Sequence, residues 1–138
     1  MEELVRFGIS MNAQLLAKFD EAIARRGYSN RSEAIRDLIR NYLVEEEWQD
    51  GDAEVAGTVT LVYDHHSSVS EVLRDLQHDH HAHVVSTLHV HQDADHCLEV
   101  VVLRGRARHI KELADRLIAL KGVKIGRLTI ATTGKELP

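Results

Sequence analysis

Nine of the ten histidines of this chain lie in one stretch that ends just before its only cysteine, Cys97. Two of them, His89 and His91, stand two residues apart in the segment TLHVH, which is rich in residues that favour β-strands. Because side chains alternate between the two faces of a strand, both imidazoles are expected on the same face. The turn-forming segment QDAD at 92–95 then leads into a second strand that starts near Cys97. The sequence therefore predicts that two imidazoles and a thiol converge on one hairpin.

Imidazole nitrogen and thiolate sulfur suit late divalent transition metals such as nickel, copper, cobalt or zinc, rather than magnesium or calcium. A fourth ligand is expected from the segment HDHHAH at 78–83, although spacing does not single out one of its members. His65, His66 and His96 lie near turns and fit surface positions or weak secondary sites, and His109 falls on a helix surface. The alternative is that these histidines face solvent and the cysteine is a small buried side chain. The paired spacing favours a metal site.

Composition limits the other classes of function. The chain has 138 residues, enough for one or two small domains, and only 4% aromatic residues, so its core must be mainly aliphatic. A net charge of −5 excludes a global basic field, so any nucleic-acid binding must use a local patch. One cysteine excludes an internal disulfide framework and fits a reducing compartment. Neither a signal peptide nor a membrane-spanning apolar run is present, and we expect a cytoplasmic protein with no membrane partner.

The first third of the chain predicts one short strand followed by two helices. Apolar and other residues alternate over 4–11, which indicates a strand. Asn12 can cap a helix over 13–26 that Gly27 can end. A second amphipathic helix is expected over 29–43, and Ser29 or Asn30 can cap it. A single strand has no partner within so short a segment, and so few residues cannot bury a sufficient core. We therefore expect a dimer in which the strands of two chains pair antiparallel.

This strand-helix-helix order and the segment GYSNRSEAIRDLI at 27–39 resemble the ribbon-helix-helix family. A two-stranded ribbon fits the DNA major groove, so the outward face of the ribbon would meet base edges. The N-terminus of the second helix would offer free amides to a phosphate. The residues at these positions are Arg6, Gly8, Ser10, Ser29, Asn30 and Arg31. The alternative is an ordinary edge strand with solvated arginines, but the motif favours DNA binding.

The rest of the chain predicts a second domain with the order βαββαβ. Strands are expected at 55–63, 84–91, 98–105 and 123–132, and helices at 67–79 and 107–120, the last closed by Gly122. This order is the ferredoxin-like (ACT-like) split motif, with two helices on one face of a four-stranded antiparallel sheet. The other face needs a cover, for which an oligomer interface is expected. We expect an α+β chain with a ribbon-helix-helix domain at 1–48, a linker at 49–54 and a ferredoxin-like domain at 55–138.

Taken nearly end to end, the chain resembles the nickel-responsive transcriptional regulators (NikR). The resemblance rests on RRGYSNRSEAIRDLIR at 25–40, TLHVH at 87–91 and CLEVVVLRG at 97–105, with the histidine cluster upstream. It implies one square-planar Ni²⁺ site per chain, with His78 supplied by a neighbouring subunit. The ligands that it implies are His78, His89, His91 and Cys97. It also implies a homotetramer, in which four metal-binding domains form the core and two DNA-binding dimers flank it.

The same resemblance implies roles for three carboxylates and shows two departures. Glu99 matches a carboxylate that supports the metal ligands, and Glu33 and Asp37 match acidic residues of a secondary cation site. The family commonly has threonine where this chain has Gly8, which removes a hydroxyl from the DNA-reading face. Basic residues that help some members to hold phosphate align roughly with serines at 67–68 here.

The function that this resemblance implies is a repressor that binds a palindromic operator when nickel-loaded and controls genes of nickel uptake. One alternative is a histidine-rich nickel or copper storage or delivery protein without a DNA role, which would hold several ions per chain. Another is an antitoxin-like DNA binder that needs no metal. An enzyme is not expected, because no nucleophile-base pair stands out and four protein ligands leave no open position for a substrate.

Overall fold

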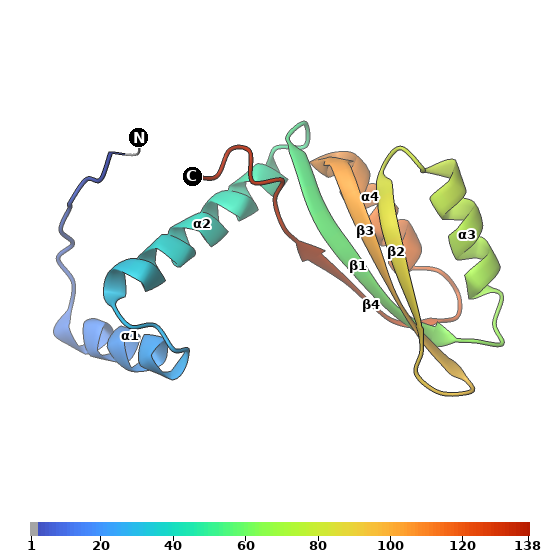
Figure 1. The fold of residues 1–138 in the computed structure, drawn as a ribbon, viewed down its shortest axis with the longest axis horizontal. Helices are drawn as coiled ribbons and strands as arrows, with labels where there is room; N and C mark the ends of the chain where they lie inside the picture. Colours follow the sequence, from blue (N-terminus) through green and yellow to red (C-terminus); the bar gives the residue numbers. More distant parts are fainter. Residues whose placement is uncertain (1–2) are drawn as a thin grey trace. The chain divides into compact units, whose positions relative to one another are not determined.

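The computed structural model describes residues 3–138, and the chain forms two compact units that divide between Arg40 and Asn41. Figure 1 traces the order of the elements, which begins with two helices and continues through a four-stranded sheet with two further helices. This order agrees with the α+β class predicted from the sequence.

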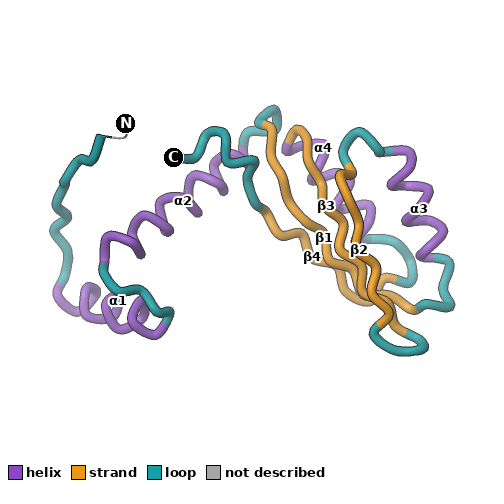
Figure 2. The backbone as a smooth tube through the Cα atoms, viewed as in Figure 1, coloured by secondary structure: helices purple, strands orange, loops and turns teal. Residues whose placement is uncertain are grey.

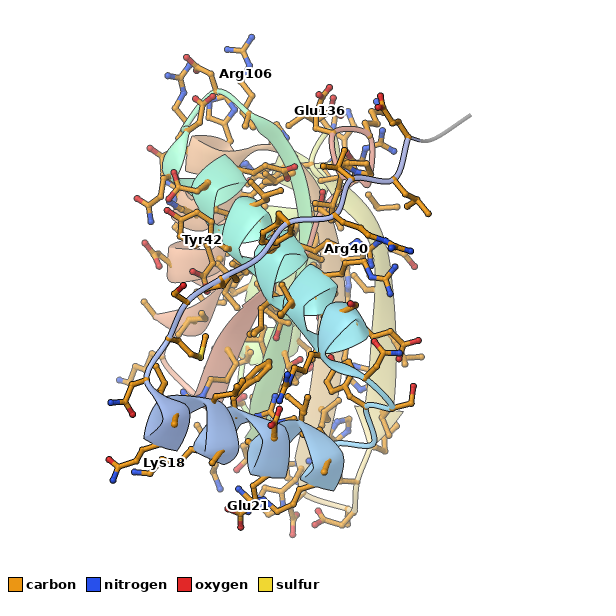
Figure 3. The ribbon with its side chains drawn as sticks, turned by 90° about the vertical axis from the view of Figure 1, so that its left-hand side faces the viewer. Lys18, Glu21, Arg40, Tyr42, Arg106 and Glu136 are labelled. Carbon is orange, nitrogen blue, oxygen red and sulfur yellow. The ribbon has the colours of Figure 1, made fainter. Side chains whose placement is uncertain are left out.

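Helix α1 (Ala13–Arg25) lies in the first unit and has the caps that the sequence predicts. The side chain of Asn12 accepts hydrogen bonds from the amides of Gln14 and Leu15, at 2.8 and 3.4 Å. Gly27, at φ 85°, follows the end of the helix, where a positive φ is least costly for glycine. The polar side of α1 faces outward, and Figure 3 shows Lys18 and Glu21 directed away from the helix on that side.

Helix α2 (Arg31–Gln49) begins as predicted and ends later than predicted. The amide of Glu33 donates to Asn30 Oδ1 at 2.9 Å, which is the expected cap. The predicted end near residue 43 is wrong, because Val44 and Trp48 are buried in the core of the second unit. Packing against another part of the chain therefore holds the last two turns.

Residues 4–11 form no strand within the single chain, although the sequence predicts one there (Figure 2). The prediction placed the partner strand in a second chain, and no segment of residues 3–138 pairs with 4–11. The apolar side chains of the segment are exposed, with Leu4 90% and Phe7 69% accessible. Together with the inner sides of α1 and the start of α2, they line an open apolar groove.

The second unit has the predicted βαββαβ order. Its elements are β1 (Glu54–Asp64), α3 (Val69–Asp79), β2 (Val84–His91), β3 (His96–Arg106), α4 (Ala107–Ile118) and β4 (Val123–Ile130). The strands lie in the order β2-β3-β1-β4, and every neighbouring pair is antiparallel. Helix α4 ends at Ile118, so Gly122 lies in the following turn at φ 104° and does not close the helix directly.

The core of this unit lies between one face of the sheet and the helices α3 and α4. Alternate residues of β1 and β3 are buried on that face, and they share one apolar cluster with the inner sides of both helices. Gly126 of β4 is needed for this packing, because a Cβ atom there would lie 2.7 Å from Cγ1 of Ile118. The predicted arrangement of two helices on one face is thus confirmed.

The opposite face of the sheet carries exposed apolar side chains. Leu88, Val90 and Ile125 are 61%, 41% and 53% accessible. Such a patch is typical of an interface between subunits. Among the described residues, no helix is both long enough and apolar enough to cross a membrane.

Candidate metal centre

The hairpin of β2 and β3 aligns the residues that the sequence singles out. Its register places His89 opposite Glu99 and His91 opposite Cys97. The turn between the strands is held by Asp93, whose Oδ1 accepts the amide of His96 at 2.8 Å. Both histidines therefore lie on the same face of the hairpin as Cys97, as their spacing predicts.

Three ligand atoms meet at the end of this hairpin. Cys97 Sγ lies 3.6 Å from Nδ1 of His91 and 3.4 Å from Nδ1 of His65. All three ligand atoms lie within 4.8 Å of one another, and the side chains of His65 and His91 are exposed while Cys97 is buried. Among the described residues this is the one group of three or more potential metal-ligating side chains that lies so close together.

His65 enters this group through the pairing of β1 with β3. Tyr63 pairs with Cys97, so the chain just beyond the end of β1 passes the cysteine, and the His65 amide donates to the Asp95 carbonyl at 2.7 Å. The sequence predicts only a surface position or a weak secondary site for His65. The available signal was its place at the end of the strand that neighbours β3 in a ferredoxin-like sheet.

His89 is oriented by a buried carboxylate. Its Nδ1 lies 2.9 Å from Oε1 of Glu99, which is only 7% exposed. When Nδ1–H donates to this carboxylate, the lone pair of Nε2 is left for a metal ion. His89 lies beside His91, with ring centroids 4.8 Å apart, but it is not part of the close three-atom group.

Glu99 is itself fixed by two further side chains that the sequence analysis did not single out. The hydroxyl of Tyr63 donates to Oε1 at 3.2 Å, and the amide of Gln77 donates to Oε2 at 3.1 Å. Burial is the main reason why the pKa of Tyr63 is raised to about 12, so its hydroxyl stays a donor at neutral pH. Both carboxylate oxygens of Glu99 therefore accept hydrogen bonds, which fixes the group that contacts His89.

His78 lies apart from this site in the single chain. It is on the last turn of α3, is exposed, and makes a ring contact with His81, at 6.5 Å between centroids. Its neighbour Gln77, by contrast, points to Glu99. The other histidines of 78–83 have different neighbours, since His80 bonds to Arg116 and His83 lies against His109.

The donor atoms fit a late transition metal. Imidazole nitrogens with a buried thiol form a softer set than the oxygen ligands that magnesium and calcium prefer. Burial, followed by the negative charges of Glu99, Asp64 and Asp93, raises the pKa of the Cys97 thiol. A metal ion must therefore displace a proton from sulfur when it binds.

Comparison with known proteins bears on both units. The family described as "NikR C terminal nickel binding domain" matches residues 56–131, and the family "Ribbon-helix-helix protein, copG family" matches residues 5–46. The chain belongs to the nickel-responsive regulator family. A Geobacter sulfurreducens protein named "Putative nickel-responsive regulator" is 58% identical over 138 residues, covering 99% of both chains. Proteins of the same name from Thermococcus kodakarensis and Pyrococcus furiosus are 54% and 56% identical, and each alignment covers at least 97% of both chains.

In this member of the nickel-responsive regulator family, the predicted DNA-reading residues Arg6, Gly8 and Ser10 are exposed. A Cβ atom at Gly8 would meet no other atom within 4 Å, so packing within the chain does not require glycine there. Arg31 is held in a bidentate pair with Asp20, at 2.8 and 2.7 Å, and its guanidinium holds the pKa of that carboxyl below its usual value.

The two carboxylates of the expected secondary cation site also have partners. Glu33 accepts a hydrogen bond from Ser29 at 3.2 Å, while Asp37 accepts one from the hydroxyl of Tyr28 and pairs with Arg40 at 3.5 Å. Both carboxylates line a small polar pocket.

Replacing Glu99 with glutamine is expected to weaken nickel binding by about 10- to 100-fold, because the neutral amide holds the His89 ring less well. Isothermal titration with nickel would measure the change. Glu112→Gln on the outer side of α4 is the matched control and should leave the affinity unchanged. Equal affinities in the two variants would contradict a role for Glu99 at the metal.

Nickel affinity is expected to rise by about tenfold per pH unit between pH 6.5 and 8, since binding releases one thiol proton. The sign follows from the raised pKa of Cys97, which keeps the thiol protonated throughout this range. Competition with a chelator of known pH dependence would measure the slope, and an affinity that does not change with pH would contradict proton displacement.

Proposed function

We propose that this protein is a cytoplasmic repressor. Its nickel-loaded form would bind a palindromic DNA operator and repress genes of nickel uptake. The observation that carries the proposal is the convergence of Cys97 and His91, beside a carboxylate-oriented His89, in a chain that also has a ribbon-helix-helix segment. The family is one of regulators, and the proposal includes no catalytic step.

The proposed Ni²⁺ ligands are His89, His91 and Cys97 of one chain together with His78 of a neighbouring chain, with one ion per chain. Glu99 supports the set by orienting His89. The exposure of His78, away from its own Cys97, leaves its imidazole accessible to a second copy. Three imidazoles and a thiolate in a plane would favour nickel or copper over zinc, which prefers a tetrahedral site.

The proposed assembly is a homotetramer with two kinds of contact besides the shared metal ion. Ribbons formed by residues 4–11 of two chains would pair and cover the apolar groove of the first unit. The exposed apolar face of the sheet would join the metal-binding domains in the core. The proposed ribbon-helix-helix domain is 1–48, of which the residues from Asn41 onward pack with the second unit, and the proposed ferredoxin-like domain is 55–138 after a linker at 49–54. Glu33 and Asp37 would bind a second cation.

The proposed DNA contacts are of two types. Arg6, Gly8 and Ser10 would face base edges from the ribbon, and the arginine fork can bond to guanine. Ser29, Asn30 and Arg31 would place the N-terminus of α2 at a phosphate. Because Arg31 is paired with Asp20, the amides at this helix end are expected to contribute more than its guanidinium.

Operator binding with and without nickel tests the proposal. DNA duplexes would be selected from a random library with the nickel-loaded protein and then measured by gel retardation with and without nickel. We expect retardation at least about tenfold tighter with nickel, within the usual size of coupling between sites. Arg6→Ala should cost about 1–3 kcal/mol of binding free energy, whereas Lys18→Ala on the outer side of α1 should cost little (Figure 3).

The result that would overturn the proposal is DNA binding that does not depend on nickel, or no selected duplex at all. Binding of several nickel ions per chain without a DNA partner would instead support a storage protein. Expected stoichiometry is one tightly bound ion per chain.

A further inference from the structure

The last two turns of α2 are built into the metal-binding unit. Trp48, the only tryptophan of the chain, is 2% exposed, and Val44 is 9% exposed in the same core. The indole Nε1 donates to the carbonyl of Ala131 at 2.9 Å. One turn of the helix is thus fixed both by burial and by a directed hydrogen bond.

Two other residues hold Trp48 in this position. Gly57 of β1 lies beneath it, since a Cβ atom there would come within 3.1 Å of Trp48 Cζ2 and 2.9 Å of the Thr129 carbonyl. Lys111 of α4 donates to the Trp48 carbonyl at 2.6 Å. The last turn of α2 has no basic residue of its own, so Lys111 supplies the positive charge that stabilises the end of the helix. We call Trp48, Gly57, Lys111 and Ala131 the Trp48 joint.

Strand β1 connects this joint with the metal centre. It carries Gly57 at the joint and Tyr63 at the site, where the hydroxyl contacts both Glu99 and His89. The two positions are about 20 Å apart along the strand. β1 pairs with a strand on each side over most of this length, so it is a stiff element.

In the other direction, α2 runs without interruption from Trp48 to Arg31, the helix end assigned above to DNA phosphate. The segment contains neither glycine nor proline. Without the joint, the connection between α2 and β1 would be only the polar segment DGDA at 50–53. A short polar tether keeps two domains close but does not transmit a change of orientation.

We propose that the Trp48 joint is the positioning element through which nickel at the metal centre acts on the ribbon-helix-helix unit. This inference rests on the proposed function. Loosening the joint leaves the metal ligands in place and detaches α2 from β1. Nickel is then still bound, while its effect on operator affinity is lost.

The test compares the full-length variants Trp48→Ala, Trp48→Phe and Lys111→Met with wild type. Lys121→Met, an exposed lysine beyond α4, is the matched control. We expect nickel affinity within about threefold of wild type in all variants, and a nickel-induced gain in operator affinity that falls at least about tenfold in Trp48→Ala. Trp48→Phe and Lys111→Met should give intermediate losses, and Lys121→Met none.

A reciprocal measurement separates this role from simple loss of structure. In wild type, operator DNA should tighten nickel binding by the same factor as nickel tightens operator binding. In Trp48→Ala that tightening should disappear, although nickel affinity without DNA is kept. If Trp48→Ala fails to fold, Lys111→Met decides the question. A full nickel effect in a folded Trp48→Ala or in Lys111→Met would overturn the inference.

Amide hydrogen exchange distinguishes failure of the joint from failure of the proposed function. Amides of residues 44–49 should be as protected as those of β1 in the metal-free wild type, and lose protection in Trp48→Ala. Rapid exchange of 44–49 in wild type would overturn the joint on its own. If these amides are protected but wild type shows no nickel effect on DNA, the proposed function fails and the coupling role fails with it.

Discussion

Replacing Cys97 with alanine is expected to weaken nickel binding by about 100- to 1,000-fold and to abolish nickel-dependent operator binding. The sulfur is the softest ligand of the set and lies 3.6 Å from Nδ1 of His91 at the end of the hairpin. One of four ligands contributes roughly a quarter of a typical metal-binding free energy. Titration with nickel and gel retardation with the same protein would measure both effects.

Cys97→Ser is the control for size, because it keeps a side chain of similar volume but replaces the thiolate with a poor ligand. The melting temperatures of both metal-free variants should stay close to that of wild type. The loss of nickel affinity would then come from the missing ligand and not from a less stable fold. An unchanged nickel affinity in Cys97→Ala would show that nickel does not bind at Cys97.

Replacing His78 with alanine is expected to lower nickel affinity by about 100-fold, whereas His65→Ala should change it by no more than about threefold. Only one of these histidines touches Cys97 within the single chain: His65, at 3.4 Å. The proposed ligand is nevertheless His78, because an exposed imidazole on α3 can be given to a second subunit. Comparing the two substitutions therefore shows whether the fourth ligand is the histidine closest to Cys97 in the same chain or the histidine of a second chain.

X-ray absorption of the nickel-loaded proteins would complete the comparison. Wild type and His65→Ala should show a planar ion with one sulfur and three nitrogen neighbours, and His78→Ala should lose one nitrogen. The opposite ranking, with His65→Ala as the damaging substitution, would place all the protein ligands in one chain and refute the shared site.

The sequence predicts the hairpin of the metal centre well because its geometry is local. Spacing by two puts His89 and His91 on one face, and a four-residue turn returns the chain at Cys97. His65 was not placed there, because its position depends on the pairing of β1 with β3, which joins residues far apart in sequence. The choice of His78 cannot be made from spacing, since the proposed ligand belongs to another chain.

The same distinction explains the helices. Ser29 and Asn30 both predict the start of α2, and the cap that forms, at Asn30, is made within one turn. Its end was predicted too early, because Trp48 is held by Ala131 and Lys111 from the other end of the chain. Residues 4–11 have the alternation of a strand, but strand pairing requires a neighbour, and residues 3–138 of the same chain do not supply one.

The uncovered side chains Phe7, Leu88 and Ile125 make this fold sensitive to how much of the protein is present. Association that buries them stabilises the folded chain by mass action, so the melting temperature should climb as the solution is made more concentrated. A regulator kept at a few copies per cell would consequently have a less stable fold than the same molecule in a concentrated laboratory sample.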